Sequence, residues 1–113
     1  MRIVLALAVS AALVSPSEVG VSQSTYKVMG AGNSSCGRWT ADHRYGVNPV
    51  ALNEESWVVG FLSGIGDVVP DANPLGGTDL DGVTGWIGNY CAAHPLISIF
   101  DAAIAFYRAH PRP

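Results

Sequence analysis

Residues 53–69, NEESWVVGFLSGIGDVV, decide the fold of this chain, because their apolar side chains recur at helical spacing. On a helical wheel one broad face carries Trp57, Val58, Phe61, Leu62, Ile65, Val68 and Val69. Gly60, Ser63 and Gly64 gather on the opposite flank, where the absence of large side chains would let another backbone approach closely. We therefore expect a central helix with neighbours on both sides.

The start of this helix is predicted at Asn53, whose side chain is suited to an N-cap. Glu54 and Glu55 would then lie in the first turn, where carboxylates interact favourably with the helix dipole. Because adjacent residues point to different faces of a helix, the two carboxylates are not expected to form a catalytic pair.

Residues 1–17 have the pattern of a secretory signal peptide. Met1 and Arg2 precede the uncharged run IVLALAVSAALV at 3–14, which is shorter than the roughly 20 apolar residues that span a bilayer. A positive start followed by a short apolar run is typical of a signal, and small residues at 15–17 predict cleavage near Ser17. A retained N-terminal anchor is the alternative.

Composition limits the classes of partner. The chain has 113 residues, 49% of them hydrophobic and 13% charged, which indicates one folded domain rather than a disordered chain. Removal of Arg2 with the signal would leave five basic and nine acidic side chains, so the net charge would change from −3 to −4. With no Lys/Arg run, nucleic acid is not an expected partner. After cleavage we expect no membrane contact and a periplasmic or secreted location.

The two cysteines, Cys36 and Cys91, are predicted to form a structural disulfide, as is usual in small exported proteins. Such a bridge would close a loop of about 55 residues and contribute about 4 kcal/mol of chain-entropy stabilisation. A reactive thiol or half of a metal site would need a CxxC, a basic neighbour or further ligands at close spacing, and the sequence has none of these.

The predicted fold is all-α, a small bundle of about four short helices with one disulfide between the first and third. Residues 18–33 are interpreted as a flexible N-terminal segment that includes a turn at 30–33, residues 34–109 as the helical domain and 110–113 as a tail. Ser34 or Ser35 would cap the first helix, and Thr78 with Asp81 resembles a capping box for the third. The predicted helices are 34–44, 53–69, 78–93 and 96–109.

No metal or cofactor is predicted. His43, His94 and His110 show no metal-ligand spacing. We interpret His43 as a half-buried histidine with satisfied hydrogen bonds and His94 as a partner for helix C-terminal carbonyls.

Residues 71–76, DANPLG, begin like a calcium loop. Leu75 stands at a ligand position, however, and Gly82 replaces the bidentate glutamate. A solvated loop and a helix cap account for the candidate ligands better than a weak calcium site does; these are Asp71, Asn73, Asp79 and Asp81.

The sequence has no GxSxG elbow or phosphate-cradling loop, and we do not expect an enzyme. A small hydrolytic enzyme is the least favoured alternative. The three tryptophans could form a ligand pocket, but core packing is favoured for Trp39 and Trp57. Trp86 lies off the apolar stripe of its helix and is the best candidate for an exposed contact.

Three motifs carry a family resemblance: Ser35-Cys36-Gly37-x-Trp39, Trp57-x-x-Gly60-Phe61-Leu62-x-Gly64 and Trp86-x-x-x-Tyr90-Cys91-x-x-His94-Pro95-Leu96. Together they resemble small exported proteins of the Rap/Tai immunity type. That resemblance implies a periplasmic, helical, disulfide-bonded protein that neutralises an effector delivered by a type VI secretion system. The two-cysteine pattern is also similar to the HdeA/HdeB acid-stress chaperones. Both resemblances rest on structural residues and carry no functional residue across.

Overall fold

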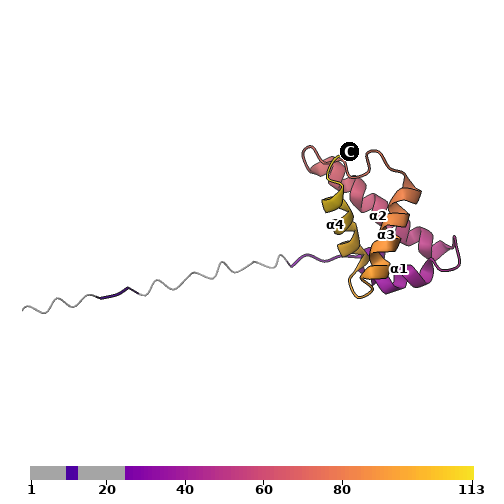
Figure 1. Cartoon of the computed structure of the whole chain (residues 1–113), viewed down its shortest axis with the longest axis horizontal. Helices are drawn as coiled ribbons and strands as arrows, with labels where there is room; N and C mark the ends of the chain where they lie inside the picture. The colour runs from indigo at the N-terminus through magenta and orange to yellow at the C-terminus, as the bar shows by residue number, and fades with distance from the viewer. Residues whose placement is uncertain (1–9, 13–24) are drawn as a thin grey trace, which may run out of the picture.

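The computed structural model describes residues 10–12 and 25–113, and it is all-helical, as the sequence predicted. Figure 1 shows the order of the elements: η1 (Gly30–Asn33), α1 (Cys36–Asp42), α2 (Pro49–Val68), α3 (Leu80–Ala93) and α4 (Ile99–Ala109). Across this part of the chain, no helix combines the length and apolar character that a membrane crossing requires. The predicted signal peptide, apart from residues 10–12, lies outside the described residues.

The central helix α2 begins four residues earlier than predicted. Asn48, not Asn53, is its N-cap, and the Asn48 side chain accepts hydrogen bonds from two backbone N–H groups of the first turn at 3.1 and 3.0 Å. Pro49 follows at the first helical position, where its missing N–H costs no intrahelical bond. Glu54 and Glu55 consequently lie beyond the first turn, so the predicted dipole role of the two glutamates is wrong.

The hydrophobic core lies along one face of α2 and is closed by the other three helices. α2 contributes Ala51, Val58 and Leu62 at helical spacing, all at most 1% exposed. Each large aliphatic side chain buried there contributes about 1.5–3 kcal/mol of transfer free energy. The remaining buried apolar residues come from α1, α3 and α4: Cys36, Trp39, Val83, Ile87, Cys91, Ile99, Ala102, Ala103 and Phe106.

The small-residue flank of α2 faces solvent, which corrects the expectation of neighbours on both sides. A Cβ added at Gly60 or Gly64 would meet no atom within 4 Å. The buried residues of α2 all fall on one face, so the other helices pack against that face alone. Trp57 and Phe61 lie at its edge, where their rings stack at 5.4 Å and pack against Phe100.

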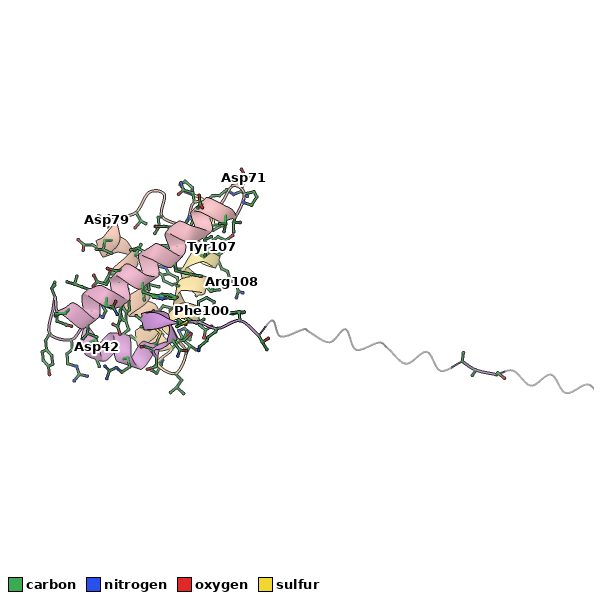
Figure 2. The ribbon with its side chains drawn as sticks, turned by 180° about the vertical axis from the view of Figure 1, so that it is seen from behind. Asp42, Asp71, Asp79, Phe100, Tyr107 and Arg108 are labelled. Atoms are coloured by element: carbon green, nitrogen blue, oxygen red, sulfur yellow. A yellow bond between two sulfur atoms is a disulfide. The ribbon has the colours of Figure 1, made fainter. Side chains whose placement is uncertain are left out.

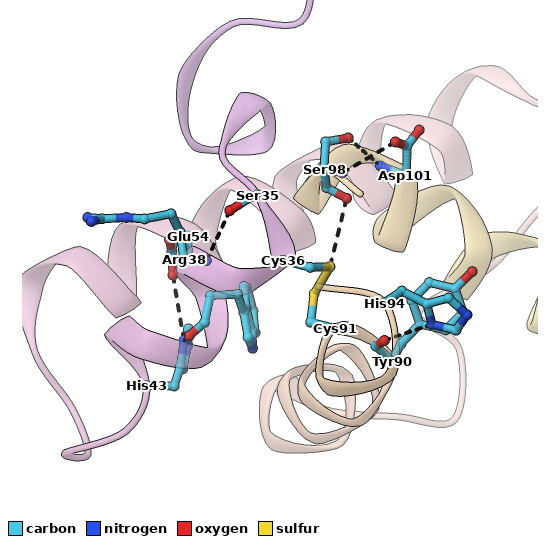
Figure 3. Close-up of a disulfide and its surroundings, with 11 residues drawn as sticks. Ser35, Cys36, Arg38, His43, Glu54, Tyr90, Cys91, His94, Ser98 and Asp101 are labelled. Carbon is cyan, nitrogen blue, oxygen red and sulfur yellow. Dashed lines mark hydrogen bonds and ion pairs between the residues drawn. A yellow bond between two sulfur atoms is a disulfide. The ribbon is translucent and has the colours of Figure 1, made fainter. Parts of the chain in front are cut away.

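The predicted disulfide between Cys36 and Cys91 is present, and both residues are fully buried. Figure 3 shows the bridge joining the first residue of α1 to α3. Backbone hydrogen bonds reinforce this junction, because the Cys36 N–H donates to the Ile97 carbonyl at 2.7 Å and the Gly37 N–H to the Pro95 carbonyl at 2.9 Å. The start of α1 is thereby attached to the connection between α3 and α4.

Residues 30–33, predicted as a flexible turn, form the 3-10 helix η1 and pack against α2. The Trp57 indole N–H donates to the Met29 carbonyl at 2.9 Å. Gly32 is buried directly against the Trp57 ring, and a Cβ at this position would overlap the ring. Glycine is therefore required here by close approach.

The starts of the last two helices also differ from the prediction. Asp79 caps α3 by accepting from the Gly82 N–H at 2.8 Å, so the predicted Thr78–Asp81 capping box is wrong. Ser98 and Asp101 form a capping box for α4, and this box places the beginning of the helix at Ile99. Leu96, the first residue of the predicted range 96–109, precedes the helix and is 95% exposed.

Candidate functional site

The three histidines each end a helix and do not converge on one site. His43, His94 and His110 are the C-caps of α1, α3 and α4. Each histidine Nδ1 lies 2.8–3.0 Å from the backbone carbonyl oxygen of the residue four positions earlier. Each imidazole also stacks on the aromatic side chain of that same residue, with ring centroids 4.1–4.3 Å apart; the three aromatic residues are Trp39, Tyr90 and Phe106. Because a carbonyl can only accept, Nδ1 is the donor in each case. The predicted roles of His43 and His94 are therefore confirmed.

Within residues 10–12 and 25–113, no group of three or more His, Cys, Asp and Glu side chains is arranged to hold a metal ion. Asp79, one of the four candidate calcium ligands, instead caps α3, a role that the predicted Thr78–Asp81 capping box had not given it.

Trp86 is not the exposed contact that its position off the helix stripe predicted. Its ring is partly buried, stacks on Tyr90 at 5.2 Å and meets Phe106 edge-on at 5.2 Å. His110, from the C-cap of α4, packs against another edge of the ring at 5.7 Å. Trp86 therefore joins α3 to the end of α4.

Exposed apolar side chains instead gather where α1 turns into α2. Tyr45 is 88% exposed, Val47 84% and Val50 50%, and we call these three residues the apolar tip. Figure 2 shows Asp42, the last residue of α1, beside the start of α2, whereas Asp71 lies beyond the far end of that helix. The tip is thus confined to one end of the molecule.

The base of the loop that carries the tip is held by Asn48. The Asn48 amide nitrogen donates to the Asp42 carbonyl at 2.6 Å and to the Gly46 carbonyl at 3.2 Å, while the amide oxygen caps α2. Gly46 has a φ of +84°, a left-handed conformation that glycine adopts without strain. One side chain therefore joins the end of α1, the loop and the beginning of α2.

A pair of carboxyl groups lies beneath this loop. Glu54, on the core face of α2, is 3% exposed. Its Oε2 atom and the Oδ2 atom of Asp42 are both buried, and neither has a hydrogen-bond partner when both groups are ionised. Burial, the negative charge of Asp42 and a hydrogen bond between the two side chains raise the pKa of Glu54 from 4.5 to about 7, while His43 and Arg38 lower it. A proton on Glu54 would satisfy both buried oxygens at once.

His43 lies between the two helices and connects the carboxyl pair to a third carboxylate. Its Nδ1 is 3.5 Å from Glu54 Oε2 (Figure 3). Its Nε2 is 3.1 Å from Glu55 Oε1. Since Nδ1 donates to the Trp39 carbonyl, Nε2 can donate to Glu55 only when the imidazole carries both protons. The adjacent glutamates therefore approach two sides of one imidazole ring.

This α1–α2 corner combines an exposed apolar surface with two carboxyl groups, each of which has a buried oxygen without a hydrogen-bond partner. Comparison with family models, curated proteins and solved structures found no match. Exposed Tyr and Val side chains suit the centre of a protein interface, whereas Glu54 is too buried to contact a substrate.

The sequence contained one signal for this corner that our prediction missed. Asn48-Pro49 is a helix-start signature, with a capping residue followed by proline at the first helical position. A helix that starts at this signature has Glu54 beyond its first turn and on its core face. No spacing rule, however, would have paired Glu54 with Asp42, because they lie on different helices.

Proposed function

We propose that this protein is an exported, non-enzymatic binding protein that contacts a protein partner through the apolar tip. The observation that carries the proposal is the exposure of Tyr45 and Val47 on a loop whose base is held by hydrogen bonds. A preorganised aromatic and aliphatic projection suits insertion into a recess, because little ordering entropy is lost on binding.

The charges around the tip define the chemistry of that partner. Arg44 immediately precedes Tyr45 and is exposed, and in the described part of the chain no carboxylate lies within ion-pair distance of it. Arg38, on the preceding helix, is 65% exposed. An apolar recess with carboxylates at its rim would complement this surface. A secreted effector is the partner that fits the resemblance to immunity proteins.

Export is supported by the signal pattern at 1–17 and by the buried disulfide, since such bridges persist in oxidising compartments. A partner would then be met outside the cytoplasm. In this function the disulfide is structural, because it holds α1 and therefore the loop that follows α1.

Placing a photoreactive amino acid at position 45 of the chain in its producing cell tests the proposal. We expect a discrete cross-linked protein in the extracytoplasmic fraction. The matched control is the same label at Val68, which is 73% exposed and lies about 27 Å along α2 from Val50 of the tip. Identical adducts from both positions, or none from position 45, would contradict the assignment of the tip.

Neutralisation is tested separately by growth competition. Cells that lack the chain should be inhibited by effector-secreting siblings, and the parent chain or Val68→Asp should restore growth. Tyr45→Asp combined with Val47→Asp should not restore growth, although it should accumulate normally because both side chains are exposed. Full rescue by this tip variant would refute neutralisation through the tip.

An acid-stress chaperone is the second candidate, and the exposed tip is the observation that favours it. A chaperone of this kind has to loosen in acid, however, whereas the Asp42–Glu54 pair becomes better satisfied on mild acidification. We therefore expect the protein to remain helical at about pH 5. Light scattering of an aggregating client protein at about pH 2–3 tests this candidate. Suppression of the client's aggregation by a near-equal amount of this protein would make the chaperone the favoured function.

A further inference from the structure

Two ionised carboxyl groups would oppose the packing of α1 on α2. Asp42 is the last residue of α1 and Glu54 lies on the core face of α2, and each has one buried oxygen without a hydrogen-bond partner. Two like charges of which one is buried and the other partly buried repel each other, and a buried acceptor without a donor costs about 1–3 kcal/mol. With one proton between them, Glu54 donates to Asp42 and both penalties disappear.

The position of this pair connects it to the apolar tip. The loop of residues 43–48 leaves α1 at Asp42 and enters α2 at Asn48, so a separation of the two helices opens the base of the loop. The Asn48 hydrogen bond to the Asp42 carbonyl crosses the same junction. Whatever moves Asp42 away from α2 therefore releases the loop as well.

The other charged groups facing the pair come from the same two helices. Arg38 Nη2 lies 3.5 Å from Asp42 Oδ2, and His43 Nδ1 lies 3.5 Å from Glu54 Oε2. Both cations favour ionised carboxylates, but they act on Glu54 less strongly than burial and Asp42 do. Glu55 contacts His43 Nε2 at 3.1 Å. No charged group of α3 or α4, within the described residues, is among those acting on Glu54.

We propose that one proton shared by Asp42 and Glu54 regulates the apolar tip, holding its loop in a fixed shape in mildly acidic surroundings and releasing it in alkaline ones. A partner that binds the fixed loop would bind more tightly on mild acidification. This inference rests on the proposed function for its biological meaning, but the proton-dependent loop can be measured without any partner.

Hydrogen exchange on the full chain tests the inference. The reporter is the His43 amide, which donates to the Trp39 carbonyl at 3.0 Å, and the internal control is the Val69 amide, which donates to the Ile65 carbonyl at 2.9 Å at the far end of α2. Protection is expressed relative to the unstructured exchange rate at the same pH. Between about pH 6 and about pH 8.5, His43 protection should fall about ten-fold while Val69 protection stays constant.

Two variants separate the shared proton from other titrations. Glu54→Gln carries a permanent donor to Asp42, and Asp42→Asn carries one to Glu54, so each should keep His43 protected across the whole range. Asp67→Asn, an exposed change near the end of α2, should behave as the parent. Constant His43 protection in the parent chain, or an equal fall in both amide variants, would overturn the inference.

The result is independent of the test of the proposed function. A pH-dependent loop combined with no cross-link at position 45 would retain the regulated loop and reject the binding function. A cross-link at position 45 combined with a pH-independent loop would retain the binding function and reject the regulated loop.

Discussion

Raising the pH from about 5 to about 8 should lower the free energy of unfolding, because Glu54 keeps a proton in the folded protein that it gives up in the unfolded chain. The folded pKa is about 7 and the ordinary value is 4.5. Between these values the folded state binds more protons than the unfolded state. The stabilisation is therefore fully present below about pH 4.5 and is lost as the pH rises through about 7.

The size of this effect follows from the separation between the two pKa values. At about 1.4 kcal/mol per unit, the full separation corresponds to roughly 3 kcal/mol. About 2.5 kcal/mol of that amount is lost between pH 5 and pH 8. At 4–8 °C per kcal/mol for a domain of this size, the thermal midpoint should fall by roughly 10 °C or more.

Urea unfolding followed by circular dichroism at four pH values between about 5 and 8 measures the effect. Glu54→Gln should flatten the profile, and the difference between parent and variant removes the contributions of the other titrating groups. Asp67→Asn is the matched control, and its profile should follow the parent. Parallel profiles for the parent and Glu54→Gln would refute the account of the buried pair.

Three further outcomes test the fold. Cys91→Ala should lower the free energy of unfolding by about 4 kcal/mol, measured by urea unfolding of the variant beside the non-reduced parent; an unchanged midpoint would contradict a stabilising bridge. Gly32→Ala should destabilise the protein by about 1–3 kcal/mol, because its Cβ would overlap with the Trp57 ring. Gly64→Ala should stabilise it by up to about 1 kcal/mol, since its Cβ meets open space. Thermal unfolding measures both effects, and equal thermal midpoints for these two variants would argue against the one-sided packing of α2. Ser98→Ala should cost about 1 kcal/mol by removing the α4 cap, and a calorimetric scan indistinguishable from that of the parent would refute the capping role.

The candidate site was only partly readable from the sequence. The half-buried state of His43 was predicted correctly, but its two glutamate contacts were not, because they depend on where α2 starts. The exposed tip was missed as well, since it lies in a stretch interpreted only as a connection. Tyr45 and Val47 are apolar residues whose exposure follows from the absence of a covering element, and composition alone does not reveal that absence.

Local physical chemistry determined several features without any knowledge of the tertiary structure. Apolar spacing identified four helices, the two cysteines specified the disulfide, and Ser35 was a correct candidate cap for α1. His94 was also assigned correctly, because a helix C-terminus exposes carbonyls to a ring four residues away. The helices, the α1 cap and the His94 contact join residues that are close in sequence, so spacing is sufficient to predict them. The disulfide joins residues 55 positions apart, and it could be predicted because the chain has only two cysteines.

Only the tertiary structure decided which faces of the helices meet. The helical wheel of α2 showed a broad apolar face and a flank of small residues, and neighbouring helices could have covered both. In the structure the other helices pack only against the apolar face, so Gly60 and Gly64 are exposed to solvent. The same choice buried Glu54 against Asp42. Contacts of this kind depend on how helices pack around a shared core, and the free energy of that packing belongs to the whole set of helices rather than to any one stretch of sequence.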